Sequence, residues 1–411
     1  MTVSLKFKSY LVIALLSGMS GCAAESTEDG KSLAPEISAA NANISFRDIP
    51  YLKKAFIDAT PADRKDGIPV GALGVDGGNK AMILQVAQEI AANKYGNFDS
   101  LLIAHKGKLI FESYYLRGRI NLPHPQASAT KVYTGLALGR AIQLGYLTMA
   151  DLDKPVVSFL KDLDPAKFVA GVEKITLHQA MTMRSGLRIS RDKLTELEGN
   201  PSPLIRENPG PLTGQRQVQA FLEHSAPITL ESQSFLYQGM DPTLVMQVIE
   251  AVVPGTAKDF IKNELLDKMG IATYDWWTDV SGLPTAGFRS SMTSRAMLKW
   301  GTLAINKGRW QGEELIPAAF VARATSKIVD QGDEYDDSAS GVTGTAYGYF
   351  WWQADLSAGD KSYLSKGARG GSGQTIIVIE ELDLVVVTTT HRRVDDPTSL
   401  IATRILPAFI K

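Results

Sequence analysis

Strand patterns near both ends of the main part of the chain, with helical patterns between them, most constrain its fold. Residues 101–105 and 108–112 are apolar runs joined by Lys106-Gly107, which predicts a β-hairpin. Residues 374–379 and 384–388 form a second pair of apolar, β-branched runs joined by a short acidic connection. Hairpins at both ends with helices inserted between them predict an α+β fold, in which an antiparallel sheet is flanked by helices and an all-helical lobe is inserted beside it.

Two helices can be placed from their start signals. Asp241-Pro242 is typical of an N-cap followed by proline in the first turn, and apolar residues follow at helical spacing. Thr293 or Ser294 is expected to cap a second helix, which ends near Gly308. We expect an α/β lobe made of residues 46–135 and 290–411, approximately, and a helical lobe made of residues 136–289.

The first 45 residues are not expected to belong to the folded domain. Lys6 and Lys8 precede a short apolar run, residues 10–16, that is too short to span a bilayer. Residues 19–22, Met-Ser-Gly-Cys, are similar to a bacterial lipobox, and Cys22 is the only cysteine in the chain. We expect a lipoprotein signal over residues 1–21, lipid on Cys22 and a flexible tether over residues 22–45. The alternative is a plain secretory signal with an incidental thiol.

Such a leader predicts an exported bacterial lipoprotein that is anchored to a membrane. Ala23 stands where an aspartate often retains lipoproteins at the inner membrane, so the periplasm-facing outer membrane is the expected destination. The net charge of −1, or −3 without Lys6 and Lys8, and the lack of a basic stripe argue against a nucleic-acid partner. The acidic residues 330–337 are expected to form a solvated loop, with a calcium site as the alternative, although their spacing lacks the EF-hand pattern.

Three Ser-x-x-Lys sequences begin at Ser128, Ser158 and Ser190. Because residues three apart on a helix share a face, such a pair places a lysine beside a serine nucleophile as its base. Ser128 follows a proline-rich approach and precedes a long apolar segment, which predicts a helix N-terminus, where the dipole and free N–H groups assist the nucleophile. Ser158 is expected on a solvated helix face and Ser190 in a polar loop. Ser128 and Lys131 are the predicted catalytic pair.

Further blocks follow this pair in a fixed order. With the hairpin over residues 101–115 they are Ser128-Ala129-Thr130-Lys131, residues 175–187, Phe235-Leu236-Tyr237, residues 347–352 and residues 368–374. Together they resemble the serine β-lactamase and penicillin-binding-protein-like hydrolases, in particular the branch with class C β-lactamases, esterases and 6-aminohexanoate-dimer hydrolases. No single block is decisive, but their order is specific. The resemblance implies a β-lactamase/transpeptidase-like domain over residues 46–411.

The resemblance also implies a role for each site residue. Ser128 would attack the carbonyl carbon and carry the acyl group, and Lys131, with its pKa lowered by burial or a neighbouring cation, would accept the proton. Tyr237 would share that proton and then protonate the leaving group or activate water. The backbone N–H groups of Ser128 and Gly371 would form the oxyanion hole. Without the other blocks, Tyr237 is typical of a core aromatic residue. His178, on an apolar helix face, is expected to be structural.

Two departures from the family pattern bear on the substrate. Ala368-Arg369-Gly370 stands where β-lactamases and peptidases usually have Lys-Thr-Gly, and Gly239 stands where an asparagine is usual. Both changes remove polar groups that would hold a β-lactam or a peptide amide. Gly370 lets a substrate lie close to the strand edge, while Arg369 either supplies a replacement cation for the substrate or points into solvent. The Tyr-x-x-x-Asp spacing of Tyr237 and Asp241 is more similar to the aminohexanoate-hydrolase branch.

These patterns predict a serine hydrolase that acts through an acyl-enzyme on an ester or amide bond of a small molecule. A β-lactamase or D-alanyl-D-alanine peptidase is the alternative, with a β-lactam-like substrate. An inactive binding or sensor module of the same fold is the alternative of another class, although the joint presence of serine, lysine and tyrosine favours an enzyme. The chain lacks Gly-x-Ser-x-Gly and zinc-binding spacings, so an α/β-hydrolase and a zinc hydrolase are disfavoured, and no cofactor is expected.

Overall fold

The computed structural model of the chain describes residues 33–38, 41, 44–198, 211–392 and 396–410. Residues Pro35–Lys411 form one compact unit. The predicted signal segment and Cys22 lie outside the described residues. Ordered contacts begin within the predicted tether, because the Ile120 N–H donates to the Pro35 carbonyl and the Ile37 N–H donates to Asn121 Oδ1 at 2.8 Å.

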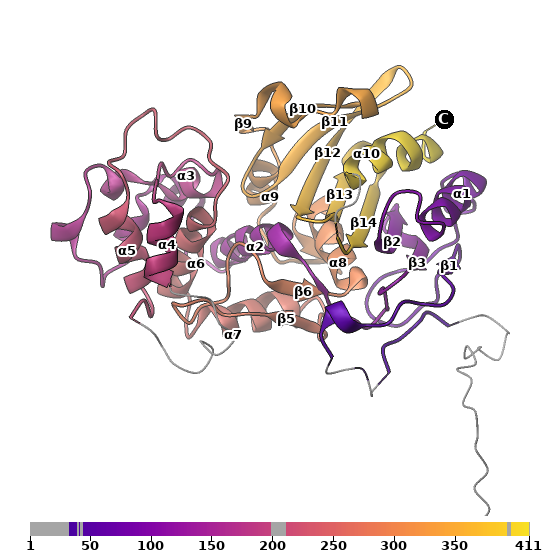
Figure 1. Cartoon of the computed structure of the whole chain (residues 1–411), viewed down its shortest axis with the longest axis horizontal. Coiled ribbons are helices and arrows are strands. Elements are labelled where there is room, and N and C mark those ends of the chain that lie inside the picture. Colours follow the sequence, from indigo (N-terminus) through magenta and orange to yellow (C-terminus); the bar gives the residue numbers. More distant parts are fainter. Residues whose placement is uncertain (1–32, 39–40, 42–43, 199–210, 393–395, 411) are drawn as a thin grey trace, which may run out of the picture. The chain divides into compact units, whose positions relative to one another are not determined.

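A nine-stranded antiparallel sheet forms the centre of this unit (Figure 1). Both predicted hairpins are present in it, and the first strand of the first hairpin, β2, pairs with the last strand of the second hairpin, β14. In sheet order the strands are β1 (Phe56–Asp58), β3 (Lys108–Tyr114), β2 (Phe98–His105), β14 (Leu384–Thr390), β13 (Gln374–Ile379), β12 (Lys361–Gly370), β11 (Trp352–Ala358), β10 (Val342–Tyr347) and β9 (Val329–Asp330).

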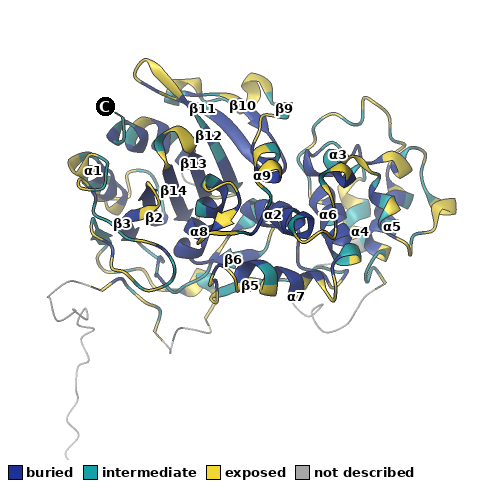
Figure 2. Cartoon of the chain, turned by 180° about the vertical axis from the view of Figure 1, so that it is seen from behind, coloured by how far each residue is buried: buried dark blue, intermediate teal, exposed yellow. Residues whose placement is uncertain are grey.

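Helices cover both faces of the sheet. One face packs its apolar side chains against α1 (Lys80–Ala91), α10 (Pro397–Leu400) and the turns that follow α10. The other face packs against α8 (Ser294–Ile305), which Thr293 caps as expected by accepting from the Ala296 N–H. Gly301 of α8 lies so close to Val385 and Ile376 that any Cβ would collide with them. The central strands are therefore buried on both sides, which explains their continuous apolar sequences (Figure 2).

Most of the other helices gather beside the sheet, so the mixed α+β architecture predicted from the sequence is confirmed (Figure 1). This group surrounds α6 (Met240–Val252), which packs on both α2 (Thr130–Gln143) and α3 (Leu177–Met181). The remaining helices of this group are α4 (Arg191–Glu198), α5 (Arg216–His224) and α7 (Ala257–Ile261). Helix α9 (Ala318–Ala324) contacts α2. Helix α2 is buried from Thr130 to Ile142 and lies between the helical group and the sheet.

The start of α6 differs from the prediction. Gly239 occupies the N-cap position, and Asp241 lies inside the first turn with a fully buried side chain. Its carboxylate accepts from the N–H and hydroxyl of Ser185 at 3.1 and 3.0 Å, so it binds a neighbouring segment in place of its own helix end. The prediction that Asp241 caps this helix was wrong, because the N–H and hydroxyl of Ser185 bind the carboxylate that would have accepted from the helix end.

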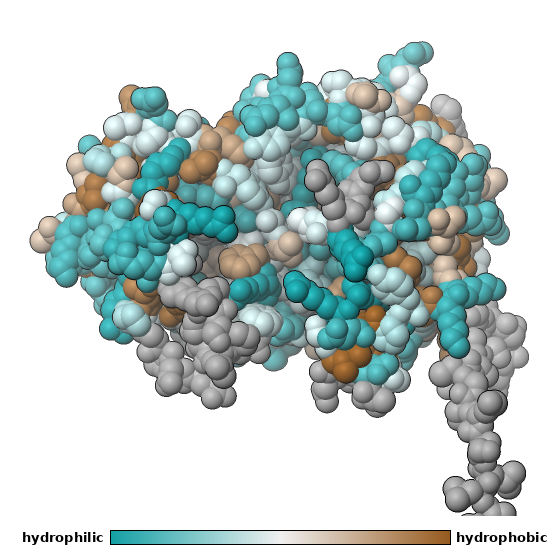
Figure 3. Space-filling model, in the orientation of Figure 1, coloured by the Kyte–Doolittle hydropathy of each residue, from teal (hydrophilic) through white to brown (hydrophobic). Residues whose placement is uncertain are grey.

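Two short sheets complete the fold. One joins β4 (His124–Pro125), β6 (Ser290–Met292) and β5 (Tyr274–Trp276), and the other joins β7 (Arg309–Trp310) and β8 (Glu313–Glu314). None of the described helices is long and apolar enough to cross a membrane. On the face drawn in Figure 3, hydrophobic residues occur in small groups among hydrophilic ones.

The acidic segment 330–337 is mostly exposed, in keeping with the predicted solvated loop, and two of its carboxylates accept hydrogen bonds. Asp336 accepts from the N–H groups of Gly344 and Thr345, and Asp337 accepts from the Ser399 hydroxyl at 2.7 Å. Within the described ranges, no three His, Cys, Asp or Glu side chains are grouped so that they could hold a metal ion.

Candidate active site

The nucleophile candidate Ser128 lies on a tight turn between β4 and α2. Residues Ala127–Ala129 form a 3₁₀ turn that continues directly into α2, so Ser128 precedes the first α-helical turn. Ala127 has a positive φ of 46°, an uncommon conformation for a residue with a side chain. The Thr130 hydroxyl stabilises this conformation by donating to the Ala127 carbonyl at 2.7 Å. Ser128 itself stays half-buried, which leaves its hydroxyl within reach of a substrate.

Lys131 lies one turn further along α2 and points at Ser128. Its Nζ donates to Ser128 Oγ at 3.3 Å and to the Gly287 carbonyl at 3.0 Å. The side chain is 5% exposed, and burial lowers the pKa of its ammonium group to about 8. No carboxylate pairs with it among the residues that the structure describes. A substantial fraction of Lys131 is therefore neutral near pH 8 and able to accept a proton.

Tyr237 approaches this pair from the segment before α6. The Lys131 Nζ lies 4.6 Å from the centroid of the Tyr237 ring. Burial raises the pKa of the Tyr237 phenol, while hydrogen bonds with Ser128 and Trp352 oppose that rise. Aromatic rings support it from behind, since Trp352 lies at 5.6 Å and Tyr347 at 6.0 Å between centroids. Ser128, Lys131 and Tyr237, which lie far apart in the sequence, thus converge on one point.

The turn between β12 and β13 lies against the other side of Ser128. A Cβ on Gly370 would lie 2.2 Å from the Gln126 carbonyl oxygen, so only glycine permits this approach to the nucleophile segment. Strand β12 ends at Gly370, and Gly371 begins the turn to Gln374. Neither the Ser128 nor the Gly371 N–H makes a loop hydrogen bond among the described residues. Both are therefore available to a substrate oxygen.

Comparisons with known proteins bear on the family and the fold of this chain. Residues 99–407 match the model of the β-lactamase family. This chain belongs to that family. An uncharacterized protein of Alkalihalophilus pseudofirmus is 20% identical over 322 residues, which are 70% of this chain and 82% of that protein.

Solved structures show the same fold at low sequence identity. A D-stereospecific amidohydrolase from Streptomyces sp. is 18% identical, with 79% of this chain and 98% of that chain covered and a TM-score of 0.57. A penicillin-binding protein homologue from Caulobacter crescentus is 13% identical, with 86% and 100% covered and a TM-score of 0.58. A class C β-lactamase is also 13% identical, with 81% and 96% covered and a TM-score of 0.58. The predicted family and fold class are confirmed.

Arg369 lies close to the aromatic residues of the site. Its guanidinium carbon is 5.9 Å from the centroid of Trp352, the ring that packs on Tyr237. Its Nε is buried and has no hydrogen-bond partner among the described residues. Burial lowers the pKa of this guanidinium, and the nearby Asp396 carboxylate opposes the shift. Arg369 thus does not extend freely into solvent, while its contact with a substrate stays a prediction.

The other predicted motifs lie elsewhere. Ser158 is exposed in a 3₁₀ turn rather than on an α-helix, and Ser190 is exposed in the loop before α4. His178 on α3 pairs its Nδ1 with the Tyr349 hydroxyl at 2.8 Å, in keeping with a structural role. The spacing of Asp241 from Tyr237 is visible in the sequence, but the contact of Asp241 with Gln238 was not predicted; Gln238 Nε2 donates to Asp241 Oδ2 at 2.6 Å.

Asp241 therefore orients the segment that carries Tyr237. Burial raises the pKa of this carboxyl to about 7, although Ser185 and Gln238 donate to it. Because Gln238 directly follows Tyr237, its hydrogen bond fixes the backbone on which the tyrosine is placed. The Tyr-x-x-x-Asp spacing is the sequence signal that could have indicated this contact.

Proposed function

We propose that this protein is a serine hydrolase that cleaves an ester or amide bond of a small molecule through an acyl-enzyme. The observation that carries the proposal is the buried lysine with a pKa of about 8 whose Nζ contacts Ser128 Oγ. A lysine in this state can take the serine proton, whereas an exposed lysine stays charged at neutral pH. The site therefore contains a nucleophile and a base that are matched to each other.

The proton has a complete route in this arrangement. Neutral Lys131 accepts the Ser128 proton as Oγ attacks the carbonyl carbon, and the carbonyl oxygen becomes an oxyanion bound by the Ser128 and Gly371 N–H groups. Tyr237 lies beside both Lys131 and Ser128, so it passes the proton to the leaving alcohol or amine. The same groups then take a proton from water, which hydrolyses the acyl-enzyme and restores Ser128.

The residues around the nucleophile favour a simple ester or linear amide over a β-lactam. Ala368 is fully buried and offers no side-chain charge to a substrate carboxylate. Gly239 faces open space and offers no side-chain amide. Each missing hydrogen-bond partner is worth about 1–3 kcal/mol. The two together lower kcat/KM for β-lactams by roughly a hundredfold, since about 1.4 kcal/mol is a factor of ten.

Covalent labelling tests the nucleophile. A fluorophosphonate probe should label the wild-type protein at Ser128 and should not label Ser128→Ala. Ser158→Ala is the matched control, because Ser158 also begins a Ser-x-x-Lys sequence but lies exposed in a 3₁₀ turn. Labelling that persists in Ser128→Ala, or hydrolysis of esters by that variant at the normal rate, would contradict the proposal, because another residue would then be the nucleophile. A wild-type protein that is neither labelled nor active on esters would favour the alternative of an inactive binding module.

An ester and a β-lactam measured side by side test the expected preference for simple esters over β-lactams. We expect a larger kcat/KM for p-nitrophenyl butyrate than for nitrocefin, measured on the same preparation. A clearly larger value for nitrocefin would favour the β-lactamase alternative and would indicate that Arg369 binds the carboxylate. Arg369→Ala would then lower nitrocefin turnover and leave ester turnover unchanged.

A further inference from the structure

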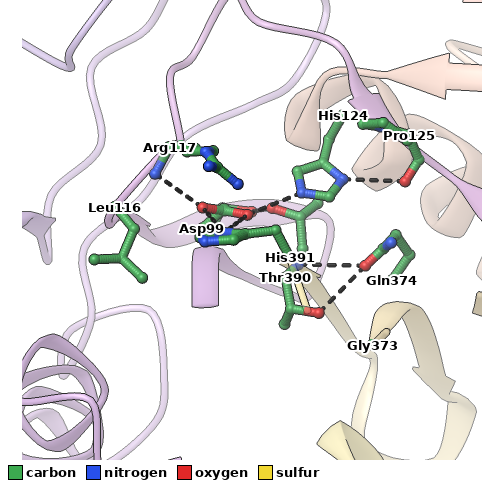
Figure 4. Close-up of polar contacts among 12 residues, drawn as sticks. Asp99, Leu116, Arg117, His124, Pro125, Gly373, Gln374, Thr390 and His391 are labelled. Atoms are coloured by element: carbon green, nitrogen blue, oxygen red, sulfur yellow. Dashed lines mark hydrogen bonds and ion pairs between the residues drawn. The ribbon is translucent and has the colours of Figure 1, made fainter. Parts of the chain in front are cut away.

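A buried carboxylate near the site is bound by two histidines from distant parts of the chain (Figure 4). Asp99, at the start of β2, is completely buried. Its Oδ2 contacts His124 Nε2 at 2.9 Å and His391 Nδ1 at 2.8 Å, and its Oδ1 accepts from the Arg117 N–H. The two imidazoles hold the pKa of Asp99 below its ordinary value despite burial, so the carboxylate is ionised.

The hydrogen-bond partners of each imidazole indicate which of its ring nitrogens can carry a proton. His391 directs Nε2 at the Tyr51 hydroxyl, 2.8 Å away, which can donate to it, so a neutral His391 with its proton on Nδ1 satisfies both contacts. His124 directs Nδ1 at the Pro125 carbonyl, 3.0 Å away, and Nε2 at the carboxylate. Both of these groups are acceptors, so a neutral His124 donates to one of them and a protonated His124 donates to both. The contact of 2.9 Å with Asp99 fixes the position of the His124 ring in either case.

His124 belongs to the segment that delivers the nucleophile. It lies in β4, four residues before Ser128. Its carbonyl accepts from Gln126 Nε2 at 2.8 Å, and Gln126 Oε1 in turn accepts from the Tyr133 hydroxyl of α2. The position of His124 thus fixes Gln126, and with it the turn that places the Ser128 N–H.

His391 belongs to the segment that supports the other oxyanion donor. The preceding residue, Thr390, ends β14 and donates from both its N–H and its hydroxyl to Gln374 Oε1 at 3.3 Å (Figure 4). Gln374 Nε2 then donates to the carbonyl of Gly371 at 3.1 Å. A short chain of hydrogen bonds therefore runs from the neighbour of His391 to the turn that carries the Gly371 N–H.

We propose that Asp99, through His124 and His391, positions the two halves of the oxyanion hole relative to each other. This inference rests on the proposed function, because it concerns the Ser128 and Gly371 N–H groups of that site. The two donors come from segments that share no secondary-structure element. Asp99 links these segments because it contacts His124 in one and His391 in the other. His124 and His391 are accordingly positioning residues rather than catalytic ones.

The effect on rate follows from the geometry that oxyanion stabilisation requires. Two N–H donors stabilise the transition state only if both lie at hydrogen-bond distance from the same oxygen. A shift of about 1 Å in a supporting contact can cost on the order of a hundredfold in rate. Loss of either imidazole also leaves the buried Asp99 charge with fewer partners, which drives the two segments apart.

His391→Ala and His391→Asn form the decisive pair. The asparagine amide nitrogen is attached at Cγ, as Nδ1 is in histidine, so His391→Asn keeps a donor to Asp99 while His391→Ala removes it. The readouts are the fraction of protein that a fluorophosphonate probe labels and the rate constant of labelling. We expect His391→Ala to be labelled completely but about tenfold or more slowly, and His391→Asn to recover most of the rate.

His105→Ala is the matched control. His105 is also a nearly buried histidine of β2 with a backbone partner, the Asp76 carbonyl, but it ends the strand about 20 Å from Asp99, at about 3.3 Å per residue. It should leave the labelling rate unchanged. If His391→Ala does not fold, His391→Gln, which moves the amide one bond outward, takes its place and should also be slow.

The possible outcomes distinguish the proposed hydrolase function from the proposed positioning role of Asp99, His124 and His391. A wild-type protein that never reacts with the probe overturns the proposed function and this inference with it. A reactive wild type, together with a His391→Ala protein labelled at the normal rate per active molecule, overturns the inference alone. The same holds if His391→Ala only reduces the labelled fraction or the melting temperature, or if His391→Asn is as slow as His391→Ala, because the cluster would then serve folding only.

Discussion

Lys131 is the residue at which function and stability conflict most directly. Burial lowers the pKa of its ammonium from the ordinary value of 10.5 to about 8, so the folded protein binds this proton less tightly than the unfolded chain does. The resulting penalty, about 3 kcal/mol by the usual conversion, is fully present below pH 8 and disappears as the pH rises from about 8 towards 10.5.

Lys131→Met should therefore stabilise the fold and abolish turnover. The loss of the contacts with Gly287 and Ser128 reduces the gain, so we expect about 1–3 kcal/mol at pH 7 from urea unfolding. The stability difference from wild type should shrink towards pH 10, and wild-type kcat/KM should rise as the pH passes through about 8. A variant that is less stable at pH 7, or a rate that falls across this range, would argue against a neutral lysine base.

At the scale of elements, the closest approach in the site is between β12 and the segment before α2. A methyl group on Gly370 would meet the Gln126 carbonyl oxygen at 2.2 Å, whereas a methyl group on Gly371 would meet nothing within 4 Å. Gly370→Ala should therefore push the β12–β13 turn away from Ser128 and lower kcat/KM by about a hundredfold. Gly371→Ala keeps its N–H and should change kcat/KM little. Steady-state kinetics of both variants measures this difference in kcat/KM. An equal loss of kcat/KM in Gly370→Ala and Gly371→Ala would show that the close contact of Gly370 with Gln126 does not position the oxyanion donors.

At the scale of the whole molecule, the proposed lipid anchor concerns the location of the protein. We expect Cys22 to carry lipid, because it is the only cysteine and follows a lipobox-like sequence. Cys22→Ser should move the protein from the membrane fraction of the producing bacterium to the soluble exported fraction, with its ester hydrolysis intact. A wild-type protein that is wholly soluble after export would refute the anchor. Fractionation with immunoblotting measures this.

Sequence alone determined the parts of this protein that depend on one element or one neighbouring pair. The 3.6-residue period of a helix brings Lys131 to Ser128 whatever surrounds them, and continuous apolar runs with short connections specify both hairpins. The ordered blocks identified the family because their order along the chain can be read without the tertiary structure.

Only the tertiary structure decided which distant segments meet. Asp241 binds Ser185 instead of capping its own helix, and Asp99 joins His124 and His391 across separations of 25 and 292 residues. Such contacts depend on strand order and on the packing of α2 between the sheet and the helical group, which short patterns do not encode. The pKa of Lys131 belongs to this second class as well, because burial by segments far away in the chain lowers it from the value of an ordinary lysine.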